Sequence, residues 1–338
     1  MAYFIHVRWK QLNTLLTGSV QVVVFVITFI LAVIAGPILI PILTRLKFGQ
    51  TVRDDGPKTH YKKMGTPTIG GLIFLIPITL VSLYFSISYP KILPMVLVTL
   101  GFGLIGLIDD LIKVIKKRKD GLYPKQKMFG LLLISTGFAF YTAYFTDLGV
   151  DVAIPFIGTV NSVVFFILFT IFVLIATTNG VNLTDGLDGL AAGVTLIVMV
   201  FFTVVAMTRA EWDYIKIFAA SVSGGCLGFL VFNIYPARVF MGDSGSLALG
   251  GAVATTAIML KMPFILLVVG AVYVVEVLSD IIQVAYFKTT GRRIFKMAPI
   301  HHHFELSGWK ETKVVAVFWT ATLILCVIAF LLLGVRFV

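Results

Sequence analysis

Ten apolar stretches separated by short charged segments constrain the fold of this sequence more than any other feature. Each is close to the ~20 residues that a helix needs to cross a bilayer. Of 338 residues, 59% are hydrophobic and 13% are charged, about half the ~25% of a typical soluble chain. We therefore predict an all-α, polytopic membrane protein with spans at about 19–44, 67–88, 92–112, 127–146, 160–179, 187–208, 216–235, 245–260, 262–287 and 314–335.

Other classes of protein are excluded by composition. The two cysteines, Cys226 and Cys326, lie inside apolar runs, so neither a disulfide framework nor a zinc cluster is expected. The first apolar run is as long as a span and lacks a small-residue cleavage site, which indicates a retained helix and not a signal peptide. We predict a single ten-helix domain over residues 1–338.

The 27 lysines and arginines orient this chain. Of the five alternate connections at about 45–66, 113–127, 180–187, 236–244 and 288–313, the four other than 180–187 together carry 20 of these 27 residues. The positive-inside rule places these connections in the cytoplasm and both termini outside. The stretch from Val152 to Thr184 is longer than one span, and its early Pro155 and Gly158 predict a short extramembrane hairpin before the helix.

Unusual polar residues gather in or beside the same connections, although the count of spans did not use them. This convergence predicts one active site at the cytoplasmic face. The residues are Asp109, Asp110, Asn182, Asp185, Asp188, Asn233, Asp243, His301, His302 and His303.

Asp109 and Asp110 end the third predicted span. They could be a plain helix end in the headgroup region, where Lys113 is well placed for an ordinary ion pair with Asp109, four residues earlier. Adjacent carboxylates repel each other unless a cation holds them, which favours a metal or substrate site. Both interpretations remain open for the pair.

Asp185 and Asp188 follow Thr184 in a connection rich in glycine and asparagine. If Thr184 caps the next helix, the two acids share one helical face. They would then either stabilise the helix N-terminus or contact a ligand that the glycines allow to approach.

The run Met-Gly-Asp-Ser-Gly-Ser at 241–246 is the strongest single signal. Its free backbone amides could cradle a phosphate while Asp243 holds a metal, and the alternative is a helix capped by Ser244. Hard oxygen ligands favour Mg²⁺, bound by Asp243 with Asp109 or Asp110 as a further ligand.

The three adjacent histidines point in different directions and would chelate a metal poorly, but at least one of them is expected to bind a ligand. The basic connections suit a small phosphorylated or nucleotide-bearing substrate. Nucleic acid is not expected, because no aromatic residues interleave with the basic ones. Glu276 and Asp280 lie four residues apart in the ninth span, and the sequence assigns them no role.

Two other classes of function compete with an enzyme. A transporter for an organic anion also uses carboxylates and glycines, but usually near the middle of the bilayer and often with inverted repeats. No such repeat is found here. A structural scaffold would not need so many carboxylates on one face.

These motifs, in this order, resemble the polyprenyl-phosphate N-acetylhexosamine-1-phosphate transferases over almost the whole chain, from Gly-Thr-Pro-Thr-Ile-Gly-Gly at 65–71 onwards. The run Met-Ala-Pro-Ile-His-His-His-Phe-Glu at 297–305 is similar to that of the branch that transfers phospho-N-acetylmuramoyl-pentapeptide. The resemblance implies transfer from the UDP-activated form to undecaprenyl phosphate, giving lipid I and UMP. It also implies Mg²⁺ as cofactor, the bacterial cytoplasmic membrane as location, and a homodimer as one option.

The resemblance also implies roles for individual residues. Asp109, Asp110 and Asp243 are expected to be catalytic, with Asp109 removing a proton from the lipid phosphate. A two-step route in which Asp243 or Asp110 attacks first remains open. One binding lysine is expected at Lys62 or Lys63, and the sequence does not distinguish the two. The other residues expected to bind substrate are Thr68, Lys113, Lys125, Asn182, Asp185, Asp188, Asn233, Gly242, Ser246, His301, His302 and His303.

Overall fold

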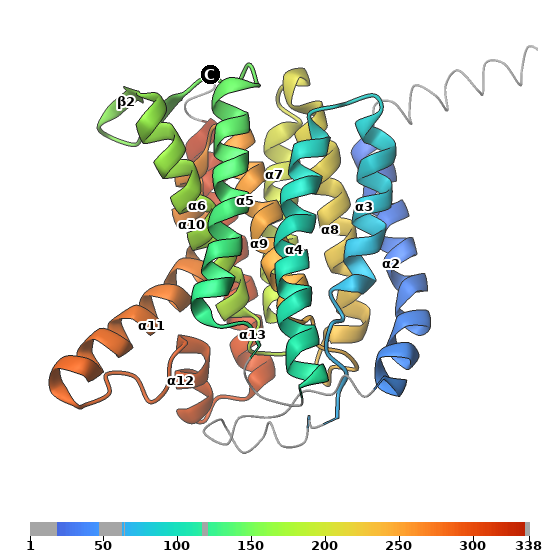
Figure 1. Cartoon of the computed structure of the whole chain (residues 1–338), viewed down its shortest axis with the longest axis vertical. Helices are drawn as coiled ribbons and strands as arrows, with labels where there is room; N and C mark the ends of the chain where they lie inside the picture. The colour runs from blue at the N-terminus through green and yellow to red at the C-terminus, as the bar shows by residue number, and fades with distance from the viewer. Residues whose placement is uncertain (1–18, 47–62, 64, 117–120, 335–338) are drawn as a thin grey trace, which may run out of the picture.

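Helices dominate the computed structural model, which describes residues 19–46, 63, 65–116 and 121–334 and confirms the all-α prediction (Figure 1). The only sheet among these residues is a two-stranded hairpin. The longer helices are α2 (Val20–Arg45), α3 (Leu72–Ser86), α4 (Ile92–Ile115), α5 (Pro124–Tyr144), α6 (Val163–Thr184), α7 (Leu190–Ala206), α8 (Asp213–Asn233), α9 (Gly242–Met259), α11 (Ala271–Thr290) and α13 (Glu311–Gly334). The shorter ones are α10 (Leu266–Val269), α12 (Ile300–Leu306), and the 3-10 turns η2 (Ala210–Trp212) and η3 (Pro263–Ile265).

Each predicted span contains a helix at its expected place. Within the described residues, five helical segments are long and apolar enough to cross a membrane, and a sixth qualifies if one bent pair counts as a single span. These observations confirm a polytopic membrane protein. The count of ten spans and the single-domain organisation stay predictions.

Helix α9 lies at the centre of the bundle, which explains why its composition differs from that of a lipid-facing span. All its residues from Ser244 to Met259 are buried, and most are Gly, Ala, Ser or Thr. Small residues let neighbouring backbones approach closely. At Gly106 on α4, an added Cβ would lie 2.0 Å from the backbone oxygen of Asp243. This close approach brings the carboxylates of α4 and α9 together.

The predicted ninth span, 262–287, is not a single helix. Helices α10 and α11 meet at Gly270 with a bend of 82°, and α11 slants away from the bundle (Figure 1). Gly270 leaves the helical conformation, with φ −98° and ψ 18°, and glycine favours such a break because it has no side chain to hold the helix. The apolar pattern alone did not reveal this bend.

The predicted basic connections correspond to helix ends that lie at one end of the bundle. In Figure 1, α4 and α6 end there, and α5, α7, α9 and α13 begin there. The predicted hairpin is confirmed at the opposite end, where β1 (Asp151–Ile154) pairs antiparallel with β2 (Gly158–Asn161). The assignment of the first end to the cytoplasm stays a prediction.

Candidate active site

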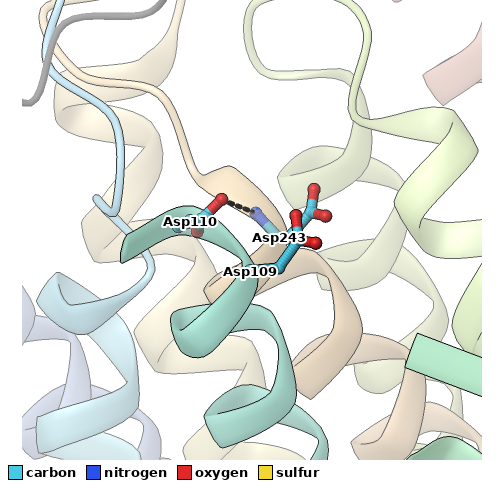
Figure 2. A group of neighbouring side chains, drawn as sticks. All are labelled: Asp109, Asp110 and Asp243. Carbon is cyan, nitrogen blue, oxygen red and sulfur yellow. Dashed lines mark hydrogen bonds between the residues drawn. The ribbon is translucent and has the colours of Figure 1, made fainter. Parts of the chain in front are cut away.

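Three buried or half-buried aspartates from two helices form the core of the candidate site. Asp109 and Asp110 come from the last turns of α4, and Asp243 comes from the first turn of α9 (Figure 2). One carboxylate oxygen from each lies within 4.8 Å of the others. The structure therefore brings together the three residues that the sequence predicted to be catalytic.

Asp110 caps the N-terminus of α9. Its Oδ1 accepts a hydrogen bond from the backbone amide of Asp243 at 3.2 Å, and its Oδ2 accepts one from Ser244 at 2.9 Å. The prediction that these amides are free to cradle a phosphate was wrong. The alternative was also wrong, because Ser244 lies inside the helix and Met241 occupies the cap position.

Two lysines supply positive charge to this cluster. Nζ of Lys113 lies 2.5 Å from Asp109, 3.8 Å from Asp110 and 3.2 Å from Asp243. The predicted pair between Asp109 and Lys113 is confirmed, and it belongs to a larger network. Nζ of Lys127 donates to Oδ2 of Asp243 at 2.8 Å.

Lys127, and not Lys125, is the lysine of α5 that reaches the cluster. Pro124 begins α5, so both lysines lie in its first turn, and Lys125 is exposed at the surface. Two residues apart on a helix, they face different directions. Helical phase could have distinguished them if the start of the helix had been known.

The polar residues around Asp243 hold its carboxylate in place. Nδ2 of Asn182 donates to Oδ1 of Asp243 at 3.1 Å and to Oγ of Ser246 at 2.8 Å.

Gly242 has φ +73°, and an added Cβ there would lie 2.6 Å from Asp110 and 3.0 Å from Thr68. Glycine is thus required at position 242, because the backbone is left-handed there and a side chain would collide with its neighbours.

The connection after α6 begins later than predicted. Helix α6 continues to Thr184, whose hydroxyl donates back to the carbonyl of Gly180, so Asn182 is helical and Thr184 does not cap α7. Asp185 follows as the C-cap and does not share a helical face with Asp188. Desolvation of the Asp185 carboxyl, reinforced by negative charge on Asp243 and other nearby aspartates, raises its pKa well above the usual value.

A second polar network lies beside this connection. Nζ of Lys63 lies 2.6 Å from Asp188 and 2.6 Å from Glu311, the first residue of α13. Burial would lower the pKa of Lys63, but the two carboxylates outweigh it and raise the pKa above its usual value. Asn233 accepts from the amide of Gly189 and donates to the carbonyl of Val239.

Of the two lysines left open by the sequence, Lys63 is thus the one seen in this network, and Lys62 lies outside the described residues. Sequence reasoning missed Glu311. The available signal was a single acid at the start of an apolar helix, which usually indicates only a favourable interaction with the helix dipole.

The three histidines of α12 have different surroundings. His301 is buried, with Nδ1 3.1 Å from Oε2 of Glu276 on α11. Nδ1 of His302 lies 2.9 Å from Oε2 of Glu305. Nδ1 of His303 accepts from the backbone amide of Lys296.

The aspartate cluster has the donor set that a divalent metal ion needs. Carboxylate oxygens are hard ligands, and each carboxylate offers about four lone-pair sites. The ammonium group of Lys113 already lies among the three carboxylates, so the cluster suits a cation. The residues present could therefore hold a metal ion.

Comparisons with known proteins place these residues in a family. The model of glycosyl transferase family 4 matches residues 92–261, which include the whole aspartate cluster. The chain is 64% identical to the phospho-N-acetylmuramoyl-pentapeptide-transferase of Acetivibrio thermocellus over 330 residues, 97% of this chain and 99% of that protein. It is 52% identical to the enzyme of the same name from Clostridium perfringens strain 13, over 91% of this chain and 97% of that one.

Proposed function

The chain belongs to glycosyl transferase family 4 and, within it, to the phospho-N-acetylmuramoyl-pentapeptide transferases, and from this membership we propose its reaction. It transfers phospho-N-acetylmuramoyl-pentapeptide from the UDP-activated form to undecaprenyl phosphate, giving lipid I and UMP. This is the first membrane step of peptidoglycan synthesis, on which cell wall growth, cell shape and division depend. The reaction takes place at the cytoplasmic face of the bacterial plasma membrane.

The observation that carries this proposal is the aspartate cluster between α4 and α9, with its two lysines. Phosphoryl transfer needs little covalent chemistry from a protein, which mainly aligns the reactants and neutralises charge. Asp243 is the proposed ligand of Mg²⁺, with Asp109 or Asp110 adding a further oxygen. Mg²⁺ bound there would stabilise the negative charge of the leaving UMP.

Lys113 and Lys127 neutralise the diphosphate of the nucleotide substrate. Both ammonium groups now contact Asp243, and lysine side chains are flexible enough to turn toward phosphate oxygens when these arrive. A substrate diphosphate would thus be bound by the two lysine ammonium groups that already balance the negative charge of the carboxylates.

Asp109 is the proposed base that removes a residual proton from the lipid phosphate, whose second pKa lies near ~6. Its Oδ1 accepts from the backbone amide of Leu122 at 2.7 Å, which fixes the orientation of the carboxylate. Both oxygens of Asp110 accept backbone amides, so Asp110 is better suited to positioning than to nucleophilic attack. Direct attack by the lipid phosphate is the favoured route.

The nucleotide sugar is proposed to lie along the connection after α6. Asn182, Asp185, Asp188 and Lys63 are its proposed contacts, together with His302. In this proposal Thr68, Asn233, Gly242 and Ser246 hold the backbone around the nucleotide. The acceptor, undecaprenyl phosphate, would reach the same cluster from the bilayer, and a homodimer is compatible with this arrangement.

The proposal is tested with purified protein in detergent containing Mg²⁺ and UDP-N-acetylmuramoyl-pentapeptide. UMP should appear only when a polyprenyl phosphate is added, and one lipid-linked diphosphate should form for each UMP. Release of UMP at the same rate without the lipid would indicate hydrolysis or an enzyme-bound intermediate. Exchange of labelled UMP into the nucleotide substrate without lipid would support the two-step route.

A further inference from the structure

Glu276 on α11 and His301 on α12 form a buried pair that the proposed chemistry does not use. Their exposed fractions are 0% and 1%, and Oε2 of Glu276 lies 3.1 Å from Nδ1 of His301. The two groups are close but are not aligned for a hydrogen bond. Within the part of the chain that the structure describes, neither side chain makes a hydrogen bond to any other residue. Each side chain is therefore the polar group that offsets the burial of the other.

The opposite edge of the His301 ring packs against the connection after α6. An added Cβ at Gly186 would lie 2.2 Å from Nε2 of His301, so the ring rests directly on the backbone of this residue. Gly186 follows Asp185, which interacts electrostatically with Asp243 and Asp188. The contacts thus run from α11 through α12 to the turn at 185–189.

Burial explains why the two side chains should act together. A carboxylate removed from water needs a donor, and a buried imidazole needs partners for its ring nitrogens. A proton on Nδ1 directed at Glu276 would fix the tautomer and the orientation of the ring, as carboxylates do for histidines in metal sites and catalytic triads. The fixed ring would in turn hold the backbone at Gly186.

We propose that Glu276 is a positioning residue, which through His301 holds the Asp185–Gly186 turn in the conformation that binds the nucleotide substrate. His301 then acts between Glu276 and the turn and does not contact the substrate. The effect on substrate binding rests on the function proposed above, whereas the effect on the turn does not. The proposal also gives Glu276 the role that the sequence left unassigned.

The test compares Glu276→Ala and Glu276→Gln with Asp280→Ala, which removes the other carboxylate of α11, four residues along and partly exposed. Hydrogen exchange followed by mass spectrometry measures the turn directly. We expect Glu276→Ala to speed exchange in a peptide covering 184–189 at least about tenfold. Glu276→Gln keeps an oxygen that can accept from Nδ1, and it should restore most of the protection. Asp280→Ala should leave this peptide unchanged.

Steady-state kinetics supply the second measurement. We expect Glu276→Ala to raise the KM for the nucleotide substrate at least about tenfold, while the KM for polyprenyl phosphate changes less than about twofold. The double variant Glu276→Ala/His301→Ala should lose no more than the worse single variant, because residues that act as one unit are not additive. If Glu276→Ala does not fold, His301→Asn replaces it, with the same expected exchange at 184–189.

Unchanged exchange at 184–189, equal increases in both KM values, or fully additive losses in the double variant would each overturn the proposal. If the parent protein releases no UMP, the proposed function fails. The exchange measurement then still tests the link from Glu276 to the turn, so the two failures are distinguishable.

Discussion

Asp110 and Asp243 are 133 residues apart in sequence, yet the carboxylate of Asp110 accepts the backbone amide of Asp243 at 3.2 Å and also caps Ser244. The end of α4 thereby stabilises the start of α9. Since an acid at a helix N-terminus is favoured by the helix dipole, this contact also reduces the repulsion expected among three neighbouring aspartates. The three aspartates thus lie together because the end of α4 packs against the start of α9 through this cap.

Removal of this cap is expected to lower stability. Asp110→Ala leaves the amides of Asp243 and Ser244 without their acceptor and should reduce the free energy of unfolding by about 1–2 kcal/mol, the upper part of the range for lost N-caps. Asp110→Asn keeps one acceptor and should lose less. Thermal unfolding in detergent, with Asp280→Ala as a control, measures the difference. Equal stability of parent and Asp110→Ala would contradict the capping role.

The two lysines of α5 make a matched pair for activity. Lys127→Gln removes the ammonium that donates to Asp243 and should lower kcat/KM at least about tenfold, a loss of ~1.4 kcal/mol in transition-state stabilisation. Lys125→Gln removes an exposed charge from the same helical turn and should change kcat/KM less than about twofold. The reverse order would return the role to Lys125, as the sequence alone had suggested.

Local features of the fold and of the site were predictable from the sequence. Apolar runs of span length located the helices, and a spacing of four residues predicted the pair between Asp109 and Lys113. The hairpin was predictable from Pro155 and Gly158 in an overlong run. Each of these inferences depends only on residues close together in the chain.

Features that depend on contacts between distant segments were not predictable. The amides of Asp243 and Ser244 looked free because Asp110 lies on another helix. Thr184 is a local exception: it looked like a cap of the next helix, but its hydroxyl donates to the carbonyl of Gly180, four residues earlier, and α6 extends to Thr184. Glycine at 270 is compatible with a straight helix or a bent one. The break before α11 could therefore be predicted only from the packing of neighbouring segments, which the sequence does not show.

Asp185 gives a prediction about pH. Its raised pKa means that the folded protein binds a proton more tightly than the unfolded chain does. Stability from this group is therefore present below the ordinary aspartate pKa and is lost as pH rises through the raised value. Asp185→Asn, which resembles the protonated form, should raise the melting temperature of the substrate-free protein at pH 8 and raise it less at pH 5. A decrease at both pH values would show that the charged form is the stabilising one.

The orientation of the bundle can be tested with single cysteines. Both native cysteines are buried, and they are replaced by alanine first. A cysteine in place of exposed Lys296, beside α12, should resist an impermeant thiol reagent added to intact cells, whereas one in place of exposed Thr159 in the hairpin should react. Labelling of the position at 296 from outside would invert the predicted topology.

The central claim is that Asp243, with Asp109 or Asp110 as a further ligand, holds the divalent cation proposed for the transfer. Mn²⁺ replaces Mg²⁺ in oxygen-ligand sites and is visible by electron paramagnetic resonance. We expect the parent protein to bind Mn²⁺ and to release UMP with undecaprenyl phosphate as acceptor. A folded Asp243→Asn variant should lose both properties, with UMP release reduced well over tenfold. A tenfold change in rate corresponds to a change of ~1.4 kcal/mol in the barrier. The claim would be contradicted if that variant bound Mn²⁺ as well as the parent does and released UMP within about tenfold of the parent rate.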